Sequence, residues 1–588
     1  MAQTTGQAVP RKLENKASFR AAVHTVLFLS GFAALFFLLT NGIPLVQAGW
    51  IHSLGKKGKY VSLMLISVPV FTVFLLLAWW KFRTVFERCC WVRLWQSLCR
   101  IPLRYTVAVF FMIYAAMMVG VGFERQLALE TRAFDLGIFA QAVWNTLHGD
   151  FLFSSIKENI NLMGDHVSPI LLGTAPFYAM WPDPRMLVLL QALAAASSFF
   201  PLALIARDKL KDRSLVLIFL LMYFFFQPMR AALHEDFHPE VLAEPFLWWA
   251  FFFLDRKQIK WFVLSLLIAV TGKENYLGIA FMLGFYAFVW KRLKFLGVLV
   301  MLGSAALLIW ETKWLVPHLI GGAYFYGANY SVMLSDPVHG VLLRILNPES
   351  LEYALKVFAP FLFLPFFHWA TLVLICPVLF QNILSVNGCM RSFNYHYLTG
   401  MTPFLFISTI YSLNAVILRT TESRPKNLGG DPSPVADGLR MTRWVVALRS
   451  IPVWLQKNIV LVGFALLLIS VLRSGPSEYW FYWNTHAHRS AHTDMIREKL
   501  GAIPRVARVM THNTLIPQVC ARKYVYQFSY NPRPTKAALA KDHAVDFVIW
   551  DRNYWESGTE PLEASLKALQ AGGYAVQFEQ DGFYILKK

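Results

Sequence analysis

Charged residues are scarce in this chain of 588 residues. They make up 15% of it, whereas an average soluble protein contains roughly 25%. The length alone would accommodate about four soluble domains of ~150 residues. The low charge content excludes that organisation for most of the chain, and it also excludes intrinsic disorder and a fibrous repeat.

Cysteine is also rare, with six residues in the whole chain. No two of them form a C-x-x-C pair, and Cys89 and Cys90 lie in a basic loop that we expect in the cytoplasm. We therefore interpret all six as free thiols and exclude a disulfide-stapled secreted fold. The sequence contains no glycine-rich phosphate loop and no internal repeat, so it predicts no soluble nucleotide site.

Apolar and aromatic residues dominate instead. Hydrophobic residues make up 56% of the chain, with 49 Phe and 20 Trp, and the mean hydropathy is +0.45. Long apolar runs with this composition predict a polytopic helical membrane protein. The net charge of +20 arises mainly in short loops beside these runs, as the positive-inside rule expects. The expected partners therefore include membrane lipids and no nucleic acid.

The basic loops predict about thirteen membrane spans, with the N-terminus in the cytoplasm. The run 261–290 has basic residues on both flanks, so we predict a hairpin of two helices that turns at Gly272-Lys273-Glu274-Asn275. The segments 123–185 and 234–240 then lie on the outer side. Besides the two helices of the hairpin, spans are expected near 22–42, 61–80, 105–122, 186–206, 214–228, 240–255, 295–316, 354–367, 369–384, 398–418 and 455–472.

Three domains are predicted from the change in composition along the chain. Residues 1–104 form an N-terminal cytoplasmic tail with two extra spans, and residues 105–473 form the main transmembrane domain. Residues 474–588 are polar and alternate strand-like and helical patterns, which predicts a C-terminal α/β domain outside the membrane. Its strands are expected at 506–510, 523–528 and 544–550, with helices near 490–500, 512–521 and 560–571 and a terminal hairpin at 574–586.

The first large outer segment contains two stretches that suggest surface helices. Apolar residues recur at helical spacing from Phe134 to Val143, which predicts an amphipathic helix at the membrane surface with Asp135 near its start and Gln141 along it. A second helix is expected over 167–181, directly after Asp165 and His166. Aspartate at a helix start also serves as a capping residue, so both a catalytic and a structural interpretation of Asp135 stay open.

A cluster of histidines and carboxylates follows at the expected outer loop His234-Glu235-Asp236-Phe237-His238-Pro239-Glu240. Two imidazoles and three carboxylates in seven residues suit a divalent metal, with Asp236, His238 and Glu240 as its ligands. The histidines can instead donate hydrogen bonds to a phosphate. A hydrated loop that caps the next helix is the third interpretation.

Two further groups of polar residues lie at expected membrane boundaries. Lys273 and Glu274 fall inside an apolar hairpin, where ionisable residues usually face a functional cavity or one another. Arg391, His396 and Tyr397 belong to a stretch of cationic and hydroxyl side chains that suits a lipid-linked phosphate. An interfacial belt of Tyr and Arg explains the second group equally simply.

Taken in order along the chain, these motifs resemble the GT-C superfamily of membrane glycosyltransferases. The plan is nearest to that of the protein O-mannosyltransferases and the bacterial aminoarabinose–lipid A transferases. The segment Phe134-Asp135-Leu136-Gly137-Ile138-Phe139, His166-Val-Ser-Pro169 and the cluster 234–240 also look like a bacterial family of predicted polytopic membrane proteins placed near GT-C. The resemblance covers roughly residues 105–420.

The resemblance implies a GT-C-like fold with two juxtamembrane helices in the first large outer loop. The catalytic carboxylate of the superfamily would map onto Asp135, and its second juxtamembrane helix onto the helix after Pro169. The Leu-Thr-Lys-Gly hairpin of the superfamily looks like Val270-Thr271-Gly272-Lys273, and its Arg-Tyr-Leu-x-Pro stretch like His396-Tyr397-Leu398 before Pro403. The chain departs from that plan in its two extra N-terminal spans and in the absence of a second acid directly after Asp135.

The function implied is transfer of a sugar from a polyprenyl-phosphate donor to a hydroxyl of a lipid, glycan or protein acceptor, with inversion, at the outer face of a cell inner membrane. A divalent cation, Mg²⁺ or Mn²⁺, is a candidate cofactor. The alternative is a polytopic transporter or lipid flippase. The donor phosphate would contact Lys273, Arg391, His396 and Tyr397; the substrate or a metal would contact Asp165, His166, His234, Glu235, Asp236, His238 and Glu240; Gln141 and Glu274 would line the same cavity.

Overall fold

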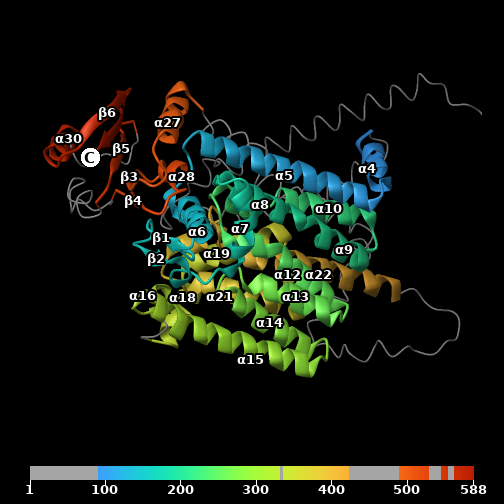
Figure 1. The fold of residues 1–588 in the computed structure, drawn as a ribbon. Coiled ribbons are helices and arrows are strands. Elements are labelled where there is room, and N and C mark those ends of the chain that lie inside the picture. The colour runs from blue at the N-terminus through green and yellow to red at the C-terminus, as the bar shows by residue number, and fades with distance from the viewer. Residues whose placement is uncertain (1–89, 332–335, 423–488, 529–543, 554–561) are drawn as a thin grey trace, which may run out of the picture.

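The computed structural model describes residues 90–331, 336–422, 489–528, 544–553 and 562–588. Within them the protein is a bundle of helices with a small sheet at one end (Figure 1). The expected spans near 22–42, 61–80 and 455–472 lie outside the described residues, and so does nearly all of the linker 419–454. The total of thirteen spans therefore stays a prediction.

Among the described residues, four helical stretches are long and apolar enough to cross a membrane. They fall on spans that the sequence predicts, because each is an uninterrupted apolar run bounded by charged residues. The four are α5 (Leu103–Leu127); α8 (Arg185–Ser197) with α9 (Phe199–Leu210); α10 (Arg213–Phe224) with α11 (Gln227–His234); and α15 (Lys294–Trp310) continuing to α16 (Val316–Ile320). The short helix α4 (Cys90–Arg100) precedes them.

The predicted hairpin is present between the basic flanks of 261–290. Its limbs are α13 (Ile259–Val270) and α14 (Tyr276–Val289), and both are too short for an ordinary membrane span. At 1.5 Å per residue, α13 extends only about 18 Å, against a hydrocarbon core of ~30 Å. Helices α12 (Pro239–Asp255) and α22 (Thr402–Glu422) also occupy predicted spans.

One predicted span, near 354–367, is wrong. Helix α19 (Pro348–Phe358) ends there, and Leu362 and Phe363 both adopt left-handed backbone angles. Pro360 and Pro365 lack the N–H that a continuous helix needs, so the segment forms short turns instead. The next predicted run, 369–384, is one helical stretch made of α20 (Trp369–Leu372), a 3₁₀ turn at Val373–Ile375 and α21 (Cys376–Leu384), and it is shorter than an ordinary span. Helix α18 (His339–Leu346) lies before α19.

Ion pairs join three of the turns that the sequence places on the cytoplasmic side. Asp255, at the end of α12, lies 2.8 Å from Nζ of Lys209 and 2.6 Å from Nζ of Lys291. Lys209 lies in the last turn of α9, Asp255 ends α12 and Lys291 follows α14, so the three turns lie at one end of the bundle. Helix α12 extends about 25 Å from there to Pro239, so the cluster 234–240 lies toward the opposite end.

The first large loop, residues 128–184, contains the two helical stretches that the sequence predicts. The first, α6 (Ile138–Leu147), follows a π-helical turn at Ala133–Gly137. A 3₁₀ turn at Pro169–Thr174 leads into the second, α7 (Ala175–Met180). Between them lies a two-stranded ribbon of β1 (Phe153–Ser154) and β2 (Ile160–Asn161). The prediction of an amphipathic surface helix is wrong for α6, because every residue from Ile138 to Asn145 is buried.

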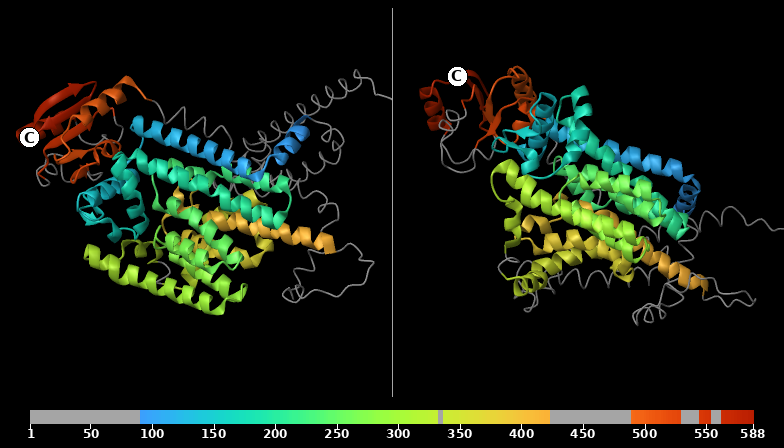
Figure 2. Two further views of the ribbon diagram at one scale, coloured as in Figure 1. Left: turned by 45° about the vertical axis from the view of Figure 1, so that its right-hand side comes forward. Right: turned by 60° about the horizontal axis from the view of Figure 1, so that its bottom comes forward.

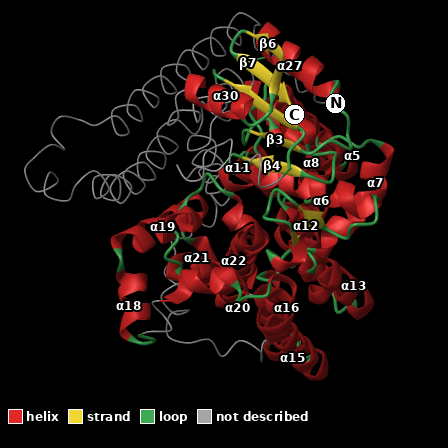
Figure 3. Ribbon diagram, turned by 60° about the vertical axis from the view of Figure 1, so that its left-hand side comes forward, coloured by secondary structure: helices red, strands yellow, loops and turns green. Residues whose placement is uncertain are grey.

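The C-terminal sheet buries one side of α6. Five strands lie in the order β4-β3-β5-β7-β6, with β4, β3 and β5 parallel and the terminal hairpin antiparallel, as expected for an α/β unit. Figures 2 and 3 show this sheet at one end of the helical bundle. The strands are β3 (Val509–Thr511), β4 (Val525–Gln527), β5 (Phe547–Asp551), β6 (Ala575–Gln580) and β7 (Phe583–Lys587); the helices are α27 (Ala491–Gly501), α28 (Ile516–Val519) and α30 (Leu562–Ala571).

The first loop and the C-terminal sheet share one hydrophobic core. Leu136 and Val143 from the loop are buried together with Ile516 and Ile549 from the C-terminal part. Apolar burial of this kind stabilises by roughly 25 cal/mol per Å². The sheet is therefore packed against the segment that carries Asp135.

Candidate functional site

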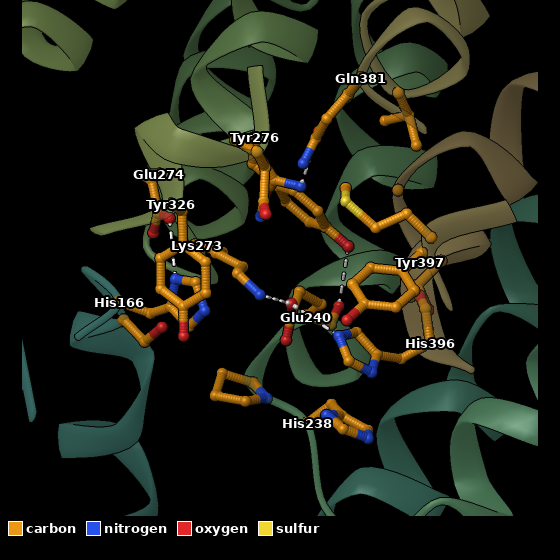
Figure 4. Close-up of a pocket in the computed structure, with 18 of the residues that line it drawn as sticks. His166, His238, Glu240, Lys273, Glu274, Tyr276, Tyr326, Gln381, His396 and Tyr397 are labelled. Carbon is orange, nitrogen blue, oxygen red and sulfur yellow. Dashed lines mark hydrogen bonds and ion pairs between the residues drawn. The ribbon is translucent and has the colours of Figure 1, made fainter. Parts of the chain in front are cut away.

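A polar cavity of about 630 Å³ lies at the end of the bundle opposite the Asp255 ion pairs. Its wall combines the segment around Asp135, the start of α12, the turn of the α13–α14 hairpin and two later loops. These parts of the chain are distant in sequence, and the bundle brings them together; Figure 4 shows several of the lining side chains around the cavity. Its charged and imidazole side chains are Asp135, Lys157, Asp165, His166, Glu235, His238, Glu240, Lys273, Glu274 and His396.

The hairpin turn places Lys273 and Glu274 against different partners. Nζ of Lys273 donates to Oε1 of Glu240 at 2.6 Å, and both side chains are largely buried. The hydroxyl of Tyr276 donates to the backbone carbonyl of Glu240 at 3.0 Å. The turn can approach α12 this closely because Gly272 has no side chain: a Cβ there would be 2.4 Å from Cβ of Ala243. Lys273 and Glu274 thus face the cavity without pairing with each other.

Glu274 accepts hydrogen bonds from the first loop and from the loop after α16. Oε1 lies 2.8 Å from Nδ1 of His166 and accepts from the hydroxyl of Tyr324 at 2.6 Å, while Oε2 accepts from the backbone N–H of Val167 at 3.1 Å. Figure 4 shows His166 and Glu274 on one side of the cavity. This carboxylate ties the first loop to the hairpin.

The same wall contains residues that the sequence analysis missed. The hydroxyl of Tyr326 donates to Asp165 at 3.0 Å, its ring stacks on His166 with centroids 4.1 Å apart, and Lys157 lies 3.3 Å from Asp165. The closely spaced tyrosines over 324–330 could have indicated this wall. The hydropathy pattern, however, shows this segment only as an outer loop.

A pair of stacked imidazoles forms the opposite wall. The rings of His238 and His396 have centroids 3.7 Å apart. Oε2 of Glu235 lies 3.4 Å from Nε2 of His238 and 3.1 Å from Nδ1 of His396, and it accepts the backbone N–H of His396 at 2.9 Å. Oε1 of Glu240 lies 3.7 Å from Nε2 of His396. The cluster of the 234–240 segment is thus completed by a histidine from a distant loop.

Burial and the neighbouring charges shift the pKa values of Glu235 and His238 in opposite directions. Burial raises the pKa of Glu235, but hydrogen bonds from His238 and His396 outweigh it and hold that pKa at about 2. Burial lowers the pKa of His238, yet the charge of Asp135 and the hydrogen bond with Glu235 raise it to about 9. Burial lowers the pKa of His396. At neutral pH the cluster therefore contains a carboxylate beside one imidazolium and one neutral imidazole.

Asp135 lies at the rim of the cavity. Its side chain is 37% exposed and its Oδ2 lies 3.9 Å from Nδ1 of His238. Among the described residues, none donates a hydrogen bond to this carboxylate, whereas the other cavity acids all have close partners. An exposed carboxylate oxygen facing a polar cavity is available to a substrate hydroxyl.

The segment of Asp135 is held by the C-terminal part of the chain. The backbone N–H of Ala133 donates to the side chain of Asn513 at 2.8 Å and to its carbonyl at 2.9 Å. Gly137 packs directly under Ile516. Gln141 donates to the carbonyl of Lys523 at 3.0 Å. Gln141 therefore anchors α6 to the sheet and does not line the cavity.

Three further predicted site residues lie outside the cavity lining. Asp236 pairs with Arg125 at 3.1 Å and accepts the backbone N–H of Arg132 at 2.8 Å, and burial raises its pKa to about 6. Arg391 pairs with Glu349 at 3.2 Å. His234 is buried at the end of α11. Tyr397, by contrast, lines the cavity beside His396.

Comparison with known proteins places the chain in a family. Two solved structures are similar, the crystal structure of ArnT from Cupriavidus metallidurans bound to undecaprenyl phosphate and that of the same protein in the apo state. The first is 12% identical with a TM-score of 0.48 over 81% of this chain and 97% of ArnT; the second is 11% identical with a TM-score of 0.47 over 82% and 98%. Comparison with curated proteins gives no match. The family described as "Predicted membrane protein (DUF2079)" matches residues 125–585, and the chain belongs to it.

Proposed function

We propose that this protein is a membrane glycosyltransferase that moves a sugar from a polyprenyl-phosphate donor to an acceptor hydroxyl. The observation that carries the proposal is the Asp135 carboxylate. It is exposed to a polar cavity at one end of an apolar helical bundle, and no described residue donates a hydrogen bond to it. A cavity at the outer end of the bundle would receive a polyprenyl-linked donor from the lipid and an acceptor from the aqueous side.

Asp135 would act as the general base. It takes the proton of the acceptor hydroxyl while the hydroxyl oxygen forms a bond to the anomeric carbon. The bond from that carbon to the phosphate oxygen breaks at the same time, and its electron pair leaves with the lipid phosphate. Attack from the face opposite the leaving group inverts the anomeric centre.

Lys273 and His396 would stabilise the leaving phosphate. Both line the cavity, and cationic or N–H groups fixed in place stabilise charge that develops in the transition state. Lys273 keeps its ion pair with Glu240 in the free protein, so a phosphate must compete with that carboxylate. Arg391, which pairs with Glu349 outside the lining, would act on the protein structure and not on the donor.

The proposal includes a location and a division of the chain. The cavity faces the outer side of a bacterial inner membrane, the N-terminus is cytoplasmic, and residues 474–588 form the outer domain. The acceptor is a lipid, glycan or protein carrying a free hydroxyl. Because the sheet packs against the segment of Asp135, the C-terminal domain would help to position the base.

The test uses the full chain reconstituted in vesicles. A panel of radiolabelled polyprenyl-phosphate sugars is added with a cell-envelope extract, and transfer of label to a new product is measured together with release of polyprenyl phosphate. Asp135→Asn should retain donor binding by native mass spectrometry and lose transfer by about 10²- to 10⁴-fold, the usual contribution of a general base.

Asp150→Asn is the matched control, since Asp150 is an exposed acid of the same loop that pairs with Lys523 outside the cavity. Equal transfer by wild type and Asp135→Asn would overturn the role of Asp135. Movement of the labelled lipid across the vesicle membrane without any product would favour the transporter alternative over the transferase.

A further inference from the structure

Three cavity residues have donor atoms spaced like the ligands of one metal ion. One donor atom from each of Glu235, His238 and His396 lies within 4.8 Å of the other two. Two ligands that are both ~2.1 Å from a shared ion are about 3.0–3.4 Å apart for angles of 90–109°. Oε2 of Glu235 lies 3.1 Å from Nδ1 of His396 and 3.4 Å from Nε2 of His238.

The outer nitrogens of both imidazoles face carboxylates. Nδ1 of His238 lies 3.9 Å from Asp135, and Nε2 of His396 lies 3.7 Å from Glu240. A carboxylate behind a metal-bound histidine orients the ring and raises its basicity as a ligand. Nε2 of His238 donates a hydrogen bond to the backbone carbonyl of Glu235 at 2.8 Å, so a metal ion bound at Nε2 must displace that proton.

The charge of the cavity favours a cation at this point. The lining contains five carboxylates and two lysines. Lys157 pairs with Asp165 and Lys273 with Glu240, and in the described part of the chain neither Asp135 nor Glu235 pairs with a lysine or arginine. Within the described residues neither carboxylate is balanced by a lysine or arginine, and the lining as a whole has more carboxylates than lysines.

We propose that Glu235, His238 and His396 bind a divalent transition-metal ion, Zn²⁺, with its open side toward the cavity. Two imidazoles and one carboxylate suit Zn²⁺, whereas Mg²⁺ prefers oxygen ligands alone. The site replaces the set expected from the sequence, because Asp236 points to Arg125 and Glu240 to Lys273. Bound there, the ion would replace His396 as the group that contacts the donor phosphate on this wall; this role rests on the proposed function.

The binding test needs no sugar donor. Purified full-length protein is stripped with a chelator, dialysed against Zn²⁺ and analysed for bound metal by mass spectrometry. We expect one Zn²⁺ per chain, unaffected by millimolar Mg²⁺. The variants His238→Gln and His396→Gln should each weaken Zn²⁺ binding by about 10²-fold, and His339→Gln should leave it unchanged, since His339 is an exposed residue far along the chain.

A second measurement guards against variants that fail to fold. Wild-type protein loaded with Co²⁺ should show the visible absorption of nitrogen-ligated cobalt, and added Zn²⁺ should remove it. Absence of that absorption, or Zn²⁺ binding that survives in both folded variants, overturns the site. Tight Zn²⁺ binding by a protein that does not bind the donor would support the metal site and overturn the proposed function. Sugar transfer that continues after complete removal of the metal would overturn the role of the ion in holding the phosphate.

Discussion

The ion pair between Lys273 and Glu240 gives a test of how the cavity is stabilised. The two charged atoms are 2.6 Å apart, and the side chains are 12% and 7% exposed. At an effective dielectric constant of 20, such a pair attracts by about 6 kcal/mol, and the loss of hydration offsets most of that gain. Removal of one partner leaves a buried charge alone, which typically costs about 3–5 kcal/mol.

The predicted perturbations are Lys273→Met, Glu240→Gln and the double variant. Each single change should lower the midpoint of thermal unfolding in detergent by about 6–10 °C, at ~2 °C per kcal/mol for a chain of this size. Lys273→Met should be the milder one, because the imidazolium of His238 still acts on the charge of Glu240. The double variant should recover most of the loss, since no unpaired charge is left.

The control is Lys157→Met, which breaks a pair with Asp165 whose lysine is 30% exposed. Asp165 is 16% exposed, so this pair is more accessible to water than Lys273–Glu240 and contributes less; its midpoint should move by less than those of the two single variants above. Unfolding is followed by the intrinsic fluorescence of the purified protein. Additive losses in the double variant would refute the reasoning, because uncoupled residues do not form a stabilising pair.

Two further predictions concern close packing around the site. Gly272→Ala should destabilise the protein by about 1–3 kcal/mol, because the added methyl group overpacks against Ala243. Ala243→Gly in the same chain should restore the unfolding midpoint. A Gly272→Ala protein as stable as wild type would contradict the close approach of the turn to α12. Asn513→Ala should lower the free energy of unfolding by about 1 kcal/mol, because it removes the hydrogen bond with Ala133. It should also speed amide hydrogen exchange over residues 133–137, whereas Gln570→Ala, at an exposed position, should not. Unchanged exchange would show that the C-terminal domain does not hold this segment.

Local patterns in the sequence were sufficient for several elements. Apolar runs with basic flanks located α5, α12 and the α13–α14 hairpin, because the bilayer requires a run of this length and the charges must stay outside it. Strand periodicity and turn residues located the terminal hairpin β6–β7. The same reasoning failed near 354–367, where hydropathy is high but two prolines prevent a continuous helix.

The environment of the first loop could not be read from its sequence. Phe134 to Val143 has the spacing of a surface helix, yet α6 is buried on every side, because the C-terminal domain covers one side of it and β1 and α7 cover others. Gln141, expected in a cavity, donates instead to the carbonyl of Lys523. A polar residue on a helix indicates a polar partner without showing which distant segment supplies it.

The sequence by itself determined the class of the protein, the helical spans between basic loops, the C-terminal α/β unit and the polar clusters that contain most of the cavity residues. Only the tertiary structure decided their partners: Lys273 pairs with Glu240, Glu274 faces His166, and Glu235 joins His396. The physical reason is distance along the chain. Hydropathy and helical period depend on neighbouring residues, whereas these contacts depend on the packing and rotation of helices more than thirty residues apart.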